Sequence, residues 1–100
     1  MQNMKSPKLL EAARGQSCAL CGADDGTVVA AHYSGLYSNA LGKGMGQKAW
    51  DHCTAHLCHR CHTDLDTYAE GNSEERAIRF MVAIFKTQKR LFDDGVLKCA

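Results

Sequence analysis

Four cysteines fall into two Cys-x-x-Cys pairs, Cys18 with Cys21 and Cys58 with Cys61. Zinc prefers thiolate sulfur in a closed tetrahedron, and each pair places two sulfur atoms at adjacent corners of it. Two pairs fill one coordination shell, so the sequence predicts a structural Zn²⁺ held by these four residues. The alternative is a redox-active Cys-x-x-Cys pair, which predicts reversible disulfide formation and no stoichiometric zinc.

Further thiols and imidazoles lie around these pairs. His56 and His59 are possible substitute ligands for the zinc, whereas Cys53 and Cys99 stand apart and are interpreted as small hydrophobic residues. Structural zinc contributes on the order of 10 kcal/mol to the folding of small peptides. We therefore expect the metal-free protein to be poorly folded.

A second set of residues is typical of hydrolysis. His62 directly follows the last cysteine and Asp66 lies four residues further on, so in a helix both side chains share one face. One imidazole and one carboxylate suit an open metal site that keeps water and phosphate oxygens bound. His32, at the end of a β-branched run, would be the general base for an attacking water. The alternative is a structural histidine beside a chance His-x-x-x-Asp pair.

Short elements must position these residues. Ser6 followed by Pro7 predicts a helix that ends at Arg14, and residues 27–32 predict a strand with Val28, Ala30 and His32 on one face. The glycine-containing stretch 33–50 is expected to be a long loop. A helix is predicted over 60–68, and a last helix, with Asn72 as its cap, over about 73–94.

The last helix carries more apolar residues than one narrow stripe needs. We expect one stripe to face the core, formed by Ile78, Met81, Val82, Phe85 and Phe92. Phe80, Ile84 and Leu91 lie off that stripe and form a second apolar face. This second face predicts a possible homodimer through the C-terminal helix.

Composition places the chain among folded globular proteins. Of its 100 residues, 45% are hydrophobic and 23% charged, which predicts one folded domain over 1–100. No apolar run is long enough for a membrane span. The first residues resemble no secretory signal, so we expect a cytoplasmic protein whose thiols stay reduced. A net charge of +1 neither requires nor excludes a nucleic-acid partner.

The order of these features resembles the zinc-containing HNH, or ββα-metal (His-Me finger), endonucleases, and within them the YbcO-type prophage nucleases. The resemblance covers roughly residues 9–66 and implies a single HNH-like nuclease domain over 1–100 with its core at about 9–70. Its motifs are the first Cys-x-x-Cys, the Ala-His32 pair, the loop with Gly42, Lys43 and Asp51, and Cys58-x-x-Cys61-His62-x-x-x-Asp66. It implies an α+β fold, a zinc-stabilised ββα core with a short N-terminal and a long C-terminal helix, and DNA as substrate.

The resemblance also implies roles for individual residues. His32 would be the general base, and His62 with Asp66 would bind the catalytic ion, Mg²⁺ or another divalent cation. Asp51 would stand where the superfamily often has an asparagine, holding the loop and orienting the base. Many relatives have a metal ligand just before the base, where this chain has Ala31. That departure weakens metal binding unless water, substrate oxygens or a residue such as His52 or His56 completes the shell.

Basic residues near the expected site are candidates for contacts with DNA phosphates. They are Lys43 and Lys48 in the glycine-rich loop and Arg60 after the second cysteine pair, with further candidates at Arg76, Arg79, Lys86, Lys89 and Arg90. For the last helix, a solvated polar face is the simpler interpretation. The alternative function is a catalytically inactive, zinc-stabilised nucleic-acid-binding or recombination-accessory protein, favoured by Ala31.

Overall fold

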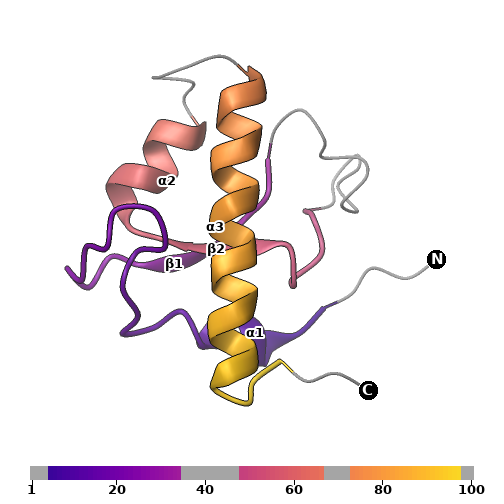
Figure 1. The fold of residues 1–100 in the computed structure, drawn as a ribbon. Helices are drawn as coiled ribbons and strands as arrows, with labels where there is room; N and C mark the ends of the chain where they lie inside the picture. The colour runs from indigo at the N-terminus through magenta and orange to yellow at the C-terminus, as the bar shows by residue number, and fades with distance from the viewer. Residues whose placement is uncertain (1–4, 35–47, 67–72, 98–100) are drawn as a thin grey trace.

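A two-stranded antiparallel sheet lies against one long helix in this mixed α+β protein (Figure 1). The computed structural model describes residues 5–34, 48–66 and 73–97. The elements in chain order are α1 (Pro7–Glu11), β1 (Val29–His32), β2 (Thr54–Leu57), α2 (His59–Asp66) and α3 (Ser73–Asp93). The α+β class predicted from the sequence is confirmed at this level.

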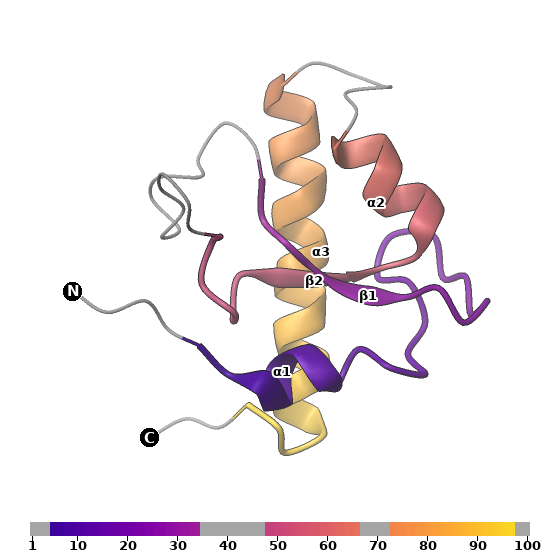
Figure 2. The same ribbon diagram turned by 180° about the vertical axis from the view of Figure 1, so that it is seen from behind.

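Strand β2 is the most buried element. It pairs with β1 so that Val29 lies opposite Leu57 and His32 opposite Thr54, and all four residues of β2 are buried. Helix α3 crosses one side of the sheet, as the front and rear views show (Figures 1 and 2). His32 therefore stands at the end of a strand that pairs along one edge with a buried neighbouring strand.

Strand β1 is shorter than the predicted 27–32, because Thr27 has another role. Its hydroxyl donates to Asp25 Oδ1 at 2.6 Å and accepts the backbone N–H of His59, the first residue of α2, at 2.9 Å. The first N–H groups of a helix lack partners within the helix, so Thr27 supplies one from a distant segment. The start of α2 is thus fixed to the chain that leads into β1.

The helices fall near their expected places. Helix α1 ends at Glu11 rather than Arg14, and turns follow it. Helix α3 spans almost the range predicted for it, whereas the predicted cap Asn72 and the end of the 60–68 helix lie outside the described residues. In the described ranges, no helix combines the length and the apolar character needed to cross a membrane.

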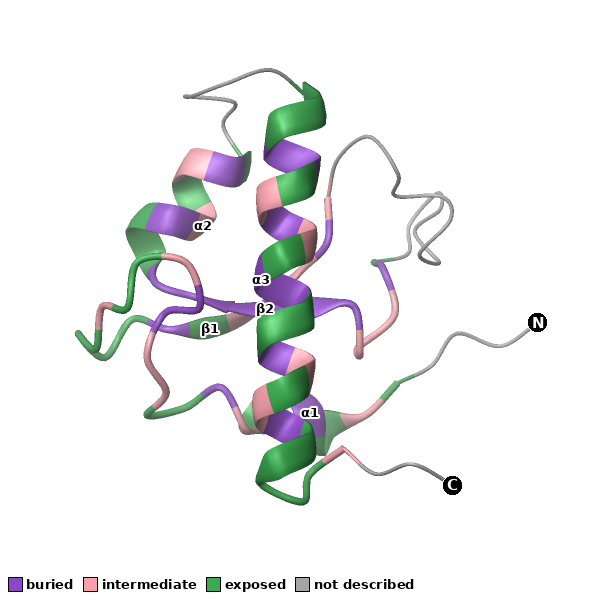
Figure 3. Cartoon of the chain, in the orientation of Figure 1, coloured by how far each residue is buried: buried purple, intermediate pink, exposed green. Residues whose placement is uncertain are grey.

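The face that α3 turns toward the core is not the predicted one. The expected core stripe is largely exposed: Ile78 is 57%, Val82 43%, Phe85 66% and Phe92 50% accessible, and Met81 is half-buried. The buried face instead contains Arg76, Ala77, Phe80, Ala83, Ile84, Thr87 and Leu91. Exposed segments recur along the outward side of α3 (Figure 3). The sequence indicated two apolar faces correctly and assigned them the wrong way round.

Packing against β2 explains this choice of face. Ala77 and Ala83 are small enough to let the helix approach the sheet, and the Phe80 ring meets Tyr33 edge to face at 5.2 Å. Thr87 Oγ1 accepts the buried backbone N–H of His56 at 2.9 Å. A buried N–H without a partner is costly, so a threonine at this point stabilises the contact better than a larger apolar residue would.

Candidate functional site

The four paired cysteines converge. Their sulfur atoms all lie within 4.8 Å of one another, and three of the four residues are buried while Cys21 is exposed. Cys21 Sγ and Cys58 Sγ are 3.6 Å apart, far longer than a disulfide bond of about 2.05 Å. A Zn–S bond of about 2.3 Å implies a tetrahedral edge of about 3.8 Å, close to that separation. The cluster could therefore hold a metal ion such as zinc.

Local backbone geometry brings each pair together. After the first pair, Gly22 adopts φ +80° and donates its N–H to the Cys18 carbonyl at 2.9 Å, while the Cys21 N–H reaches Cys18 Sγ at 3.5 Å. A residue with a Cβ is strained at this φ, which explains glycine here. The second pair uses a helix start, because Cys58 precedes α2 and Cys61 lies within its first turn.

The charge balance of the cluster favours a cation. Burial raises the pKa of Cys58 and of Cys61, where hydrogen bonds among the thiols raise it further. Burial opposes ionisation of Cys18 too, but hydrogen bonds from the backbone N–H groups of Cys21 and its neighbours lower the pKa of its thiol. The thiol of Cys18 therefore ionises at a lower pH than the thiols of Cys58 and Cys61. A bound dication is what would let all four ionise together.

The other cysteines and histidines stay apart from this cluster. Cys53 is 5% exposed within the hydrophobic core, and burial raises the pKa of its thiol, which fits the small hydrophobic residue predicted for it. Cys99 lies outside the described residues. His59 is exposed, and His56 faces the Arg90 guanidinium with its Nδ1 3.0 Å from NH1. Neither histidine joins the ligand group, so their suggested role as substitute ligands is wrong.

A separate open pocket of about 310 Å³ gathers most of the predicted catalytic set. His32 reaches it from the end of β1, Lys48 from the segment before β2, and His62 with Asp66 from α2. These residues are far apart in the sequence, and the β1–β2–α2 arrangement brings them to one opening. None of the residues lining the pocket belongs to α3.

His32 is held by Asp51 at the edge of this pocket. Its Nε2–H donates to Asp51 Oδ1 at 2.9 Å, and Asp51 Oδ2 accepts the backbone N–H of Ser6 at 2.6 Å. The two side chains are only 17% and 13% exposed. Burial alone raises the pKa of the Asp51 carboxyl, but the hydrogen bonds from His32 and Ser6 outweigh it and keep that pKa below its usual range. Asp51 is thus an anionic acceptor that fixes the imidazole and leaves Nδ1 to accept a proton.

His62 and Asp66 form the second pair in the pocket. His62 Nε2 lies 3.0 Å from Asp66 Oδ2 across one turn of α2, with side-chain exposures of 35% and 44%. Within the described ranges, no third histidine, cysteine or acidic residue joins them as a metal-ligand group. Ala31 is buried beside His32 and offers no ligand atom. Two protein ligands fit a divalent cation only if water or substrate oxygens complete its shell.

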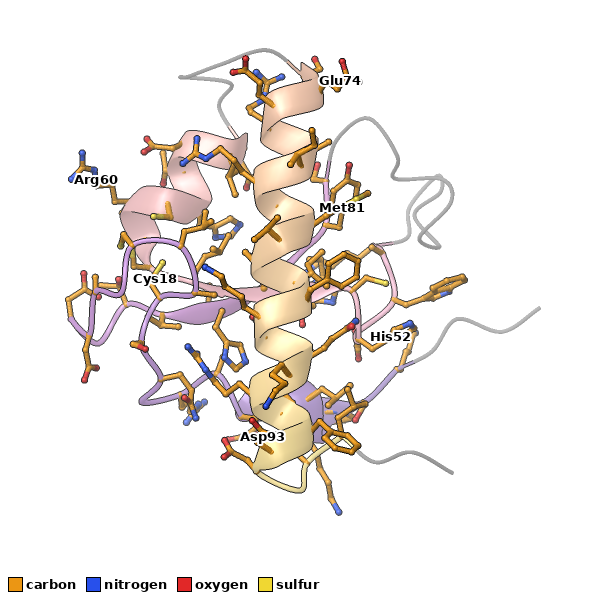
Figure 4. The ribbon with its side chains drawn as sticks, in the orientation of Figure 1. Cys18, His52, Arg60, Glu74, Met81 and Asp93 are labelled. Atoms are coloured by element: carbon orange, nitrogen blue, oxygen red, sulfur yellow. The ribbon has the colours of Figure 1, made fainter. Side chains whose placement is uncertain are left out.

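The two histidines named as possible additional ligands lie elsewhere. His52 stacks on Trp50, with ring centroids 5.6 Å apart and an interplanar angle of 12°. Its position, away from the Cys18 side of the molecule, can be followed in Figure 4. His56 is fully buried against α3. Neither residue lines the pocket, so the suggestion that one of them completes the metal shell is not supported by their positions.

The expected phosphate-binding residues are distributed unevenly. Lys48 is exposed and lines the pocket, Lys43 lies outside the described residues, and Arg60 projects from α2 into solvent (Figure 4). Positions 60 and 62 differ by about 200° around a helix, so Arg60 does not share the face of His62. Of the two that the structure describes, Lys48 lies at the pocket and Arg60 does not.

Some positioning contacts had no clear signal in the sequence. Arg90, a candidate for phosphate binding, instead donates to the Ser17 carbonyl at 2.9 Å and meets His56. Ser6 stands at the N-cap of α1 but makes no capping bond with its side chain, and its backbone N–H instead donates to Asp51 Oδ2. A hydrogen bond to a backbone group can involve almost any residue type, so it leaves no recognisable pattern in the sequence. Arg90 is half-buried beside the core-facing side of α3, and the sequence offered no signal for that position.

Comparison of the chain with protein-family models, with curated proteins and with solved structures finds no match.

Proposed function

We propose that this protein is a metal-dependent endonuclease of the HNH type, which hydrolyses phosphodiester bonds in DNA and is phage-derived and cytoplasmic. The observation that carries the proposal is the convergence of His32, Lys48, His62 and Asp66 on one open pocket, with His32 fixed by Asp51. A general base, a cation-binding pair and a basic residue are the groups that phosphodiester hydrolysis requires. The cysteine cluster, with zinc bound, would serve as the structural centre.

Each residue has a defined task in this proposal. His32 Nδ1 accepts the proton of the attacking water, whose oxygen forms the new bond to phosphorus as the leaving oxygen departs. Asp51 keeps the imidazole in the tautomer that presents a free Nδ1 and stabilises the imidazolium that forms. Lys48 attracts the backbone phosphate. A divalent cation held by His62 and Asp66 would neutralise negative charge at the scissile phosphate.

Plasmid nicking tests this function. The zinc-loaded protein should convert supercoiled plasmid to the open circle with Mg²⁺ or Mn²⁺, and EDTA should stop the reaction. His32→Ala should lower the rate by at least about 100-fold, because general-base catalysis contributes about that much. His59→Ala is the matched control, since it removes an exposed histidine outside the pocket. Equal loss in both variants, with intact folding and zinc content, would contradict the assignment of His32.

A catalytically inactive nucleic-acid-binding protein is the second candidate, and Ala31 is the observation that favours it. Without a ligand at that position, the described pocket offers only two protein ligands. This candidate predicts salt-sensitive DNA binding by the wild type with no nicking under any divalent cation. Introducing the missing ligand as Ala31→Asp should create nicking if only metal affinity is lacking.

A further inference from the structure

Helix α3 presents an apolar stripe to solvent on the side opposite the sheet. The stripe consists of Ile78, Val82, Phe85 and Phe92, and continues to Val96 just beyond the helix. Away from α3 and the turn that follows it, Val29 is the one large hydrophobic residue that is exposed in the described ranges. Concentration of such residues on one helix face is a mark of an interaction surface rather than of ordinary surface composition.

The spacing of the stripe is that of a helix that pairs with another helix. Steps of four, three, four and three residues connect positions 78, 82, 85, 89 and 92, with Lys89 as the one polar member of this run. Alternating steps of three and four keep side chains along a single seam against a partner helix. The opposite face is already used, because Phe80, Ala83 and Ile84 pack on the sheet. The exposed seam therefore needs an external partner.

Charges along the same seam favour a second copy in the opposite direction. One step before Ile78 the seam reaches Glu75, in the acidic first turn of α3. Near the other end the seam carries Lys89, whose ammonium group also pairs with Asp93 of the same helix. A parallel pair of identical helices would place Glu75 against Glu75 and Lys89 against Lys89. An antiparallel pair centred near Val82 places Glu75 of each helix beside Lys89 of the other, so that opposite charges meet.

We propose that two copies of this chain associate through the exposed stripe of α3, with the two helices antiparallel. Helix α3 extends from the end near Glu74 to the end near Asp93 (Figure 4). With 21 residues it forms a seam about 30 Å long, at about 1.5 Å per residue. In a two-fold symmetric dimer, each apolar contact between two different residues occurs twice. Since no α3 residue lines the pocket, both pockets stay open in the dimer. This inference does not depend on the nuclease proposal.

Sedimentation equilibrium of the zinc-loaded full chain tests the association. The wild type should show a concentration-dependent monomer–dimer equilibrium. Phe85→Glu places a charge in the centre of the seam of both copies and should weaken dimerisation by at least about 100-fold. Val29→Glu is the matched control, because it makes the same kind of change at an exposed apolar residue outside α3, and should leave the equilibrium unchanged. Circular dichroism and zinc content should be the same in all three proteins.

Charge reversal tests the direction of the helices. Glu75→Lys should weaken the antiparallel dimer by about 5-fold at low salt, and combining it with Lys89→Glu should restore the wild-type affinity. In a parallel dimer the single reversal exchanges one like-charge contact for another and leaves the affinity unchanged. A wild type that stays monomeric at high micromolar concentration, or a dimer that survives Phe85→Glu, overturns the proposal.

Discussion

The cysteine cluster and the pocket at His32 differ in how closed they are. The cluster brings four ligand atoms within 4.8 Å of one another, and three of its four residues are buried. The pocket is open, and the side chains of its His62–Asp66 pair, the proposed metal ligands, are 35% and 44% exposed. Closed four-ligand sites stabilise a fold, whereas open sites with few protein ligands leave room for water and substrate.

The hydrogen bonds that hold the cysteine cluster and the pocket in place also differ. The cluster is connected to the buried interior, since the Ala19 N–H donates to the His56 carbonyl at 2.7 Å and Arg90 binds the Ser17 carbonyl. The pocket depends on the short contact between Ser6 and Asp51 near the N-terminus. We therefore expect damage at the cluster to affect folding and damage at the pocket to affect chemistry.

Loss of the cluster should have the largest effect. Removal of zinc by a strong chelator, or Cys58→Ser, should remove on the order of 10 kcal/mol of folding free energy and abolish cooperative thermal unfolding. Near-ultraviolet circular dichroism and metal analysis, with one zinc expected per chain, measure this. Cys53→Ala is the control, because Cys53 is equally buried but outside the cluster, and should keep its zinc. An unchanged melting curve after complete chelation would show that the cluster does not stabilise the fold.

Acidification should destabilise the protein through His56. Burial and, after it, the neighbouring Arg90 charge lower the pKa of this imidazole to about 4, while Asp94 opposes the shift. Between pH 6.5 and about 4 the unfolded chain binds a proton that the folded protein excludes, so stability falls as the pH falls through this window. The full difference is on the order of 3 kcal/mol.

Urea unfolding of the zinc-loaded protein at several pH values measures this slope. His56→Gln keeps a neutral acceptor for Arg90 and should flatten the slope between pH 6.5 and about 4, while zinc release contributes equally to both proteins. Identical slopes in wild type and variant would show that His56 is not the group that titrates.

Arg90→Ala should cost about 2–3 kcal/mol of unfolding free energy, because it leaves the Ser17 carbonyl and His56 Nδ1 without their donor. Lys86→Ala removes a neighbouring exposed cation on the same helix and should change stability by less than about 0.5 kcal/mol. The denaturant midpoints of the two variants measure this difference in unfolding free energy. Equal midpoints would mean that Arg90 belongs to the solvated surface, as the sequence suggested.

The smallest stability effect is expected in the pocket. His62→Ala should reduce the unfolding free energy by less than about 1 kcal/mol, since its ion pair with Asp66 is partly exposed and lies within one helix turn. The same variant should lose divalent-dependent nicking if the proposed function is correct. Thermal unfolding and zinc analysis measure the first expectation. Loss of zinc in this variant would show that the pocket and the cysteine cluster are not independent of each other.

Local spacing carried most of what could be predicted. Each Cys-x-x-Cys pair and the His62–Asp66 pair are set by neighbours within four residues, so turn and helix geometry alone places their side chains together. The strand before His32 and the span of α3 follow from β-branched and apolar runs in the same way. Such signals depend only on residues that are close together in the sequence. They can therefore be recognised without knowledge of the tertiary structure.

Assignment of the α3 faces failed for a physical reason. The stripe with Ile78 and Phe85 is the more apolar one, but the sheet selected the face with Ala83, which allows close approach, and Thr87, which satisfies a buried N–H. Hydrophobicity summed along a helix ignores both shape and the hydrogen-bond needs of the neighbour. The contact of Ser6 with Asp51 escaped prediction because it uses a backbone group 45 residues away.

The sequence by itself determined the chemical inventory: two sulfur pairs, an imidazole–carboxylate pair on one helix face, and a long helix with two apolar sides. Only the tertiary structure decided how the two sulfur pairs are brought together and which side of α3 stays exposed. It also decided that His32 forms a hydrogen bond with Asp51 beside the pocket that His62 lines. Those outcomes depend on distant segments competing for the same buried space and the same hydrogen-bond partners, and that competition leaves no trace in short-range spacing.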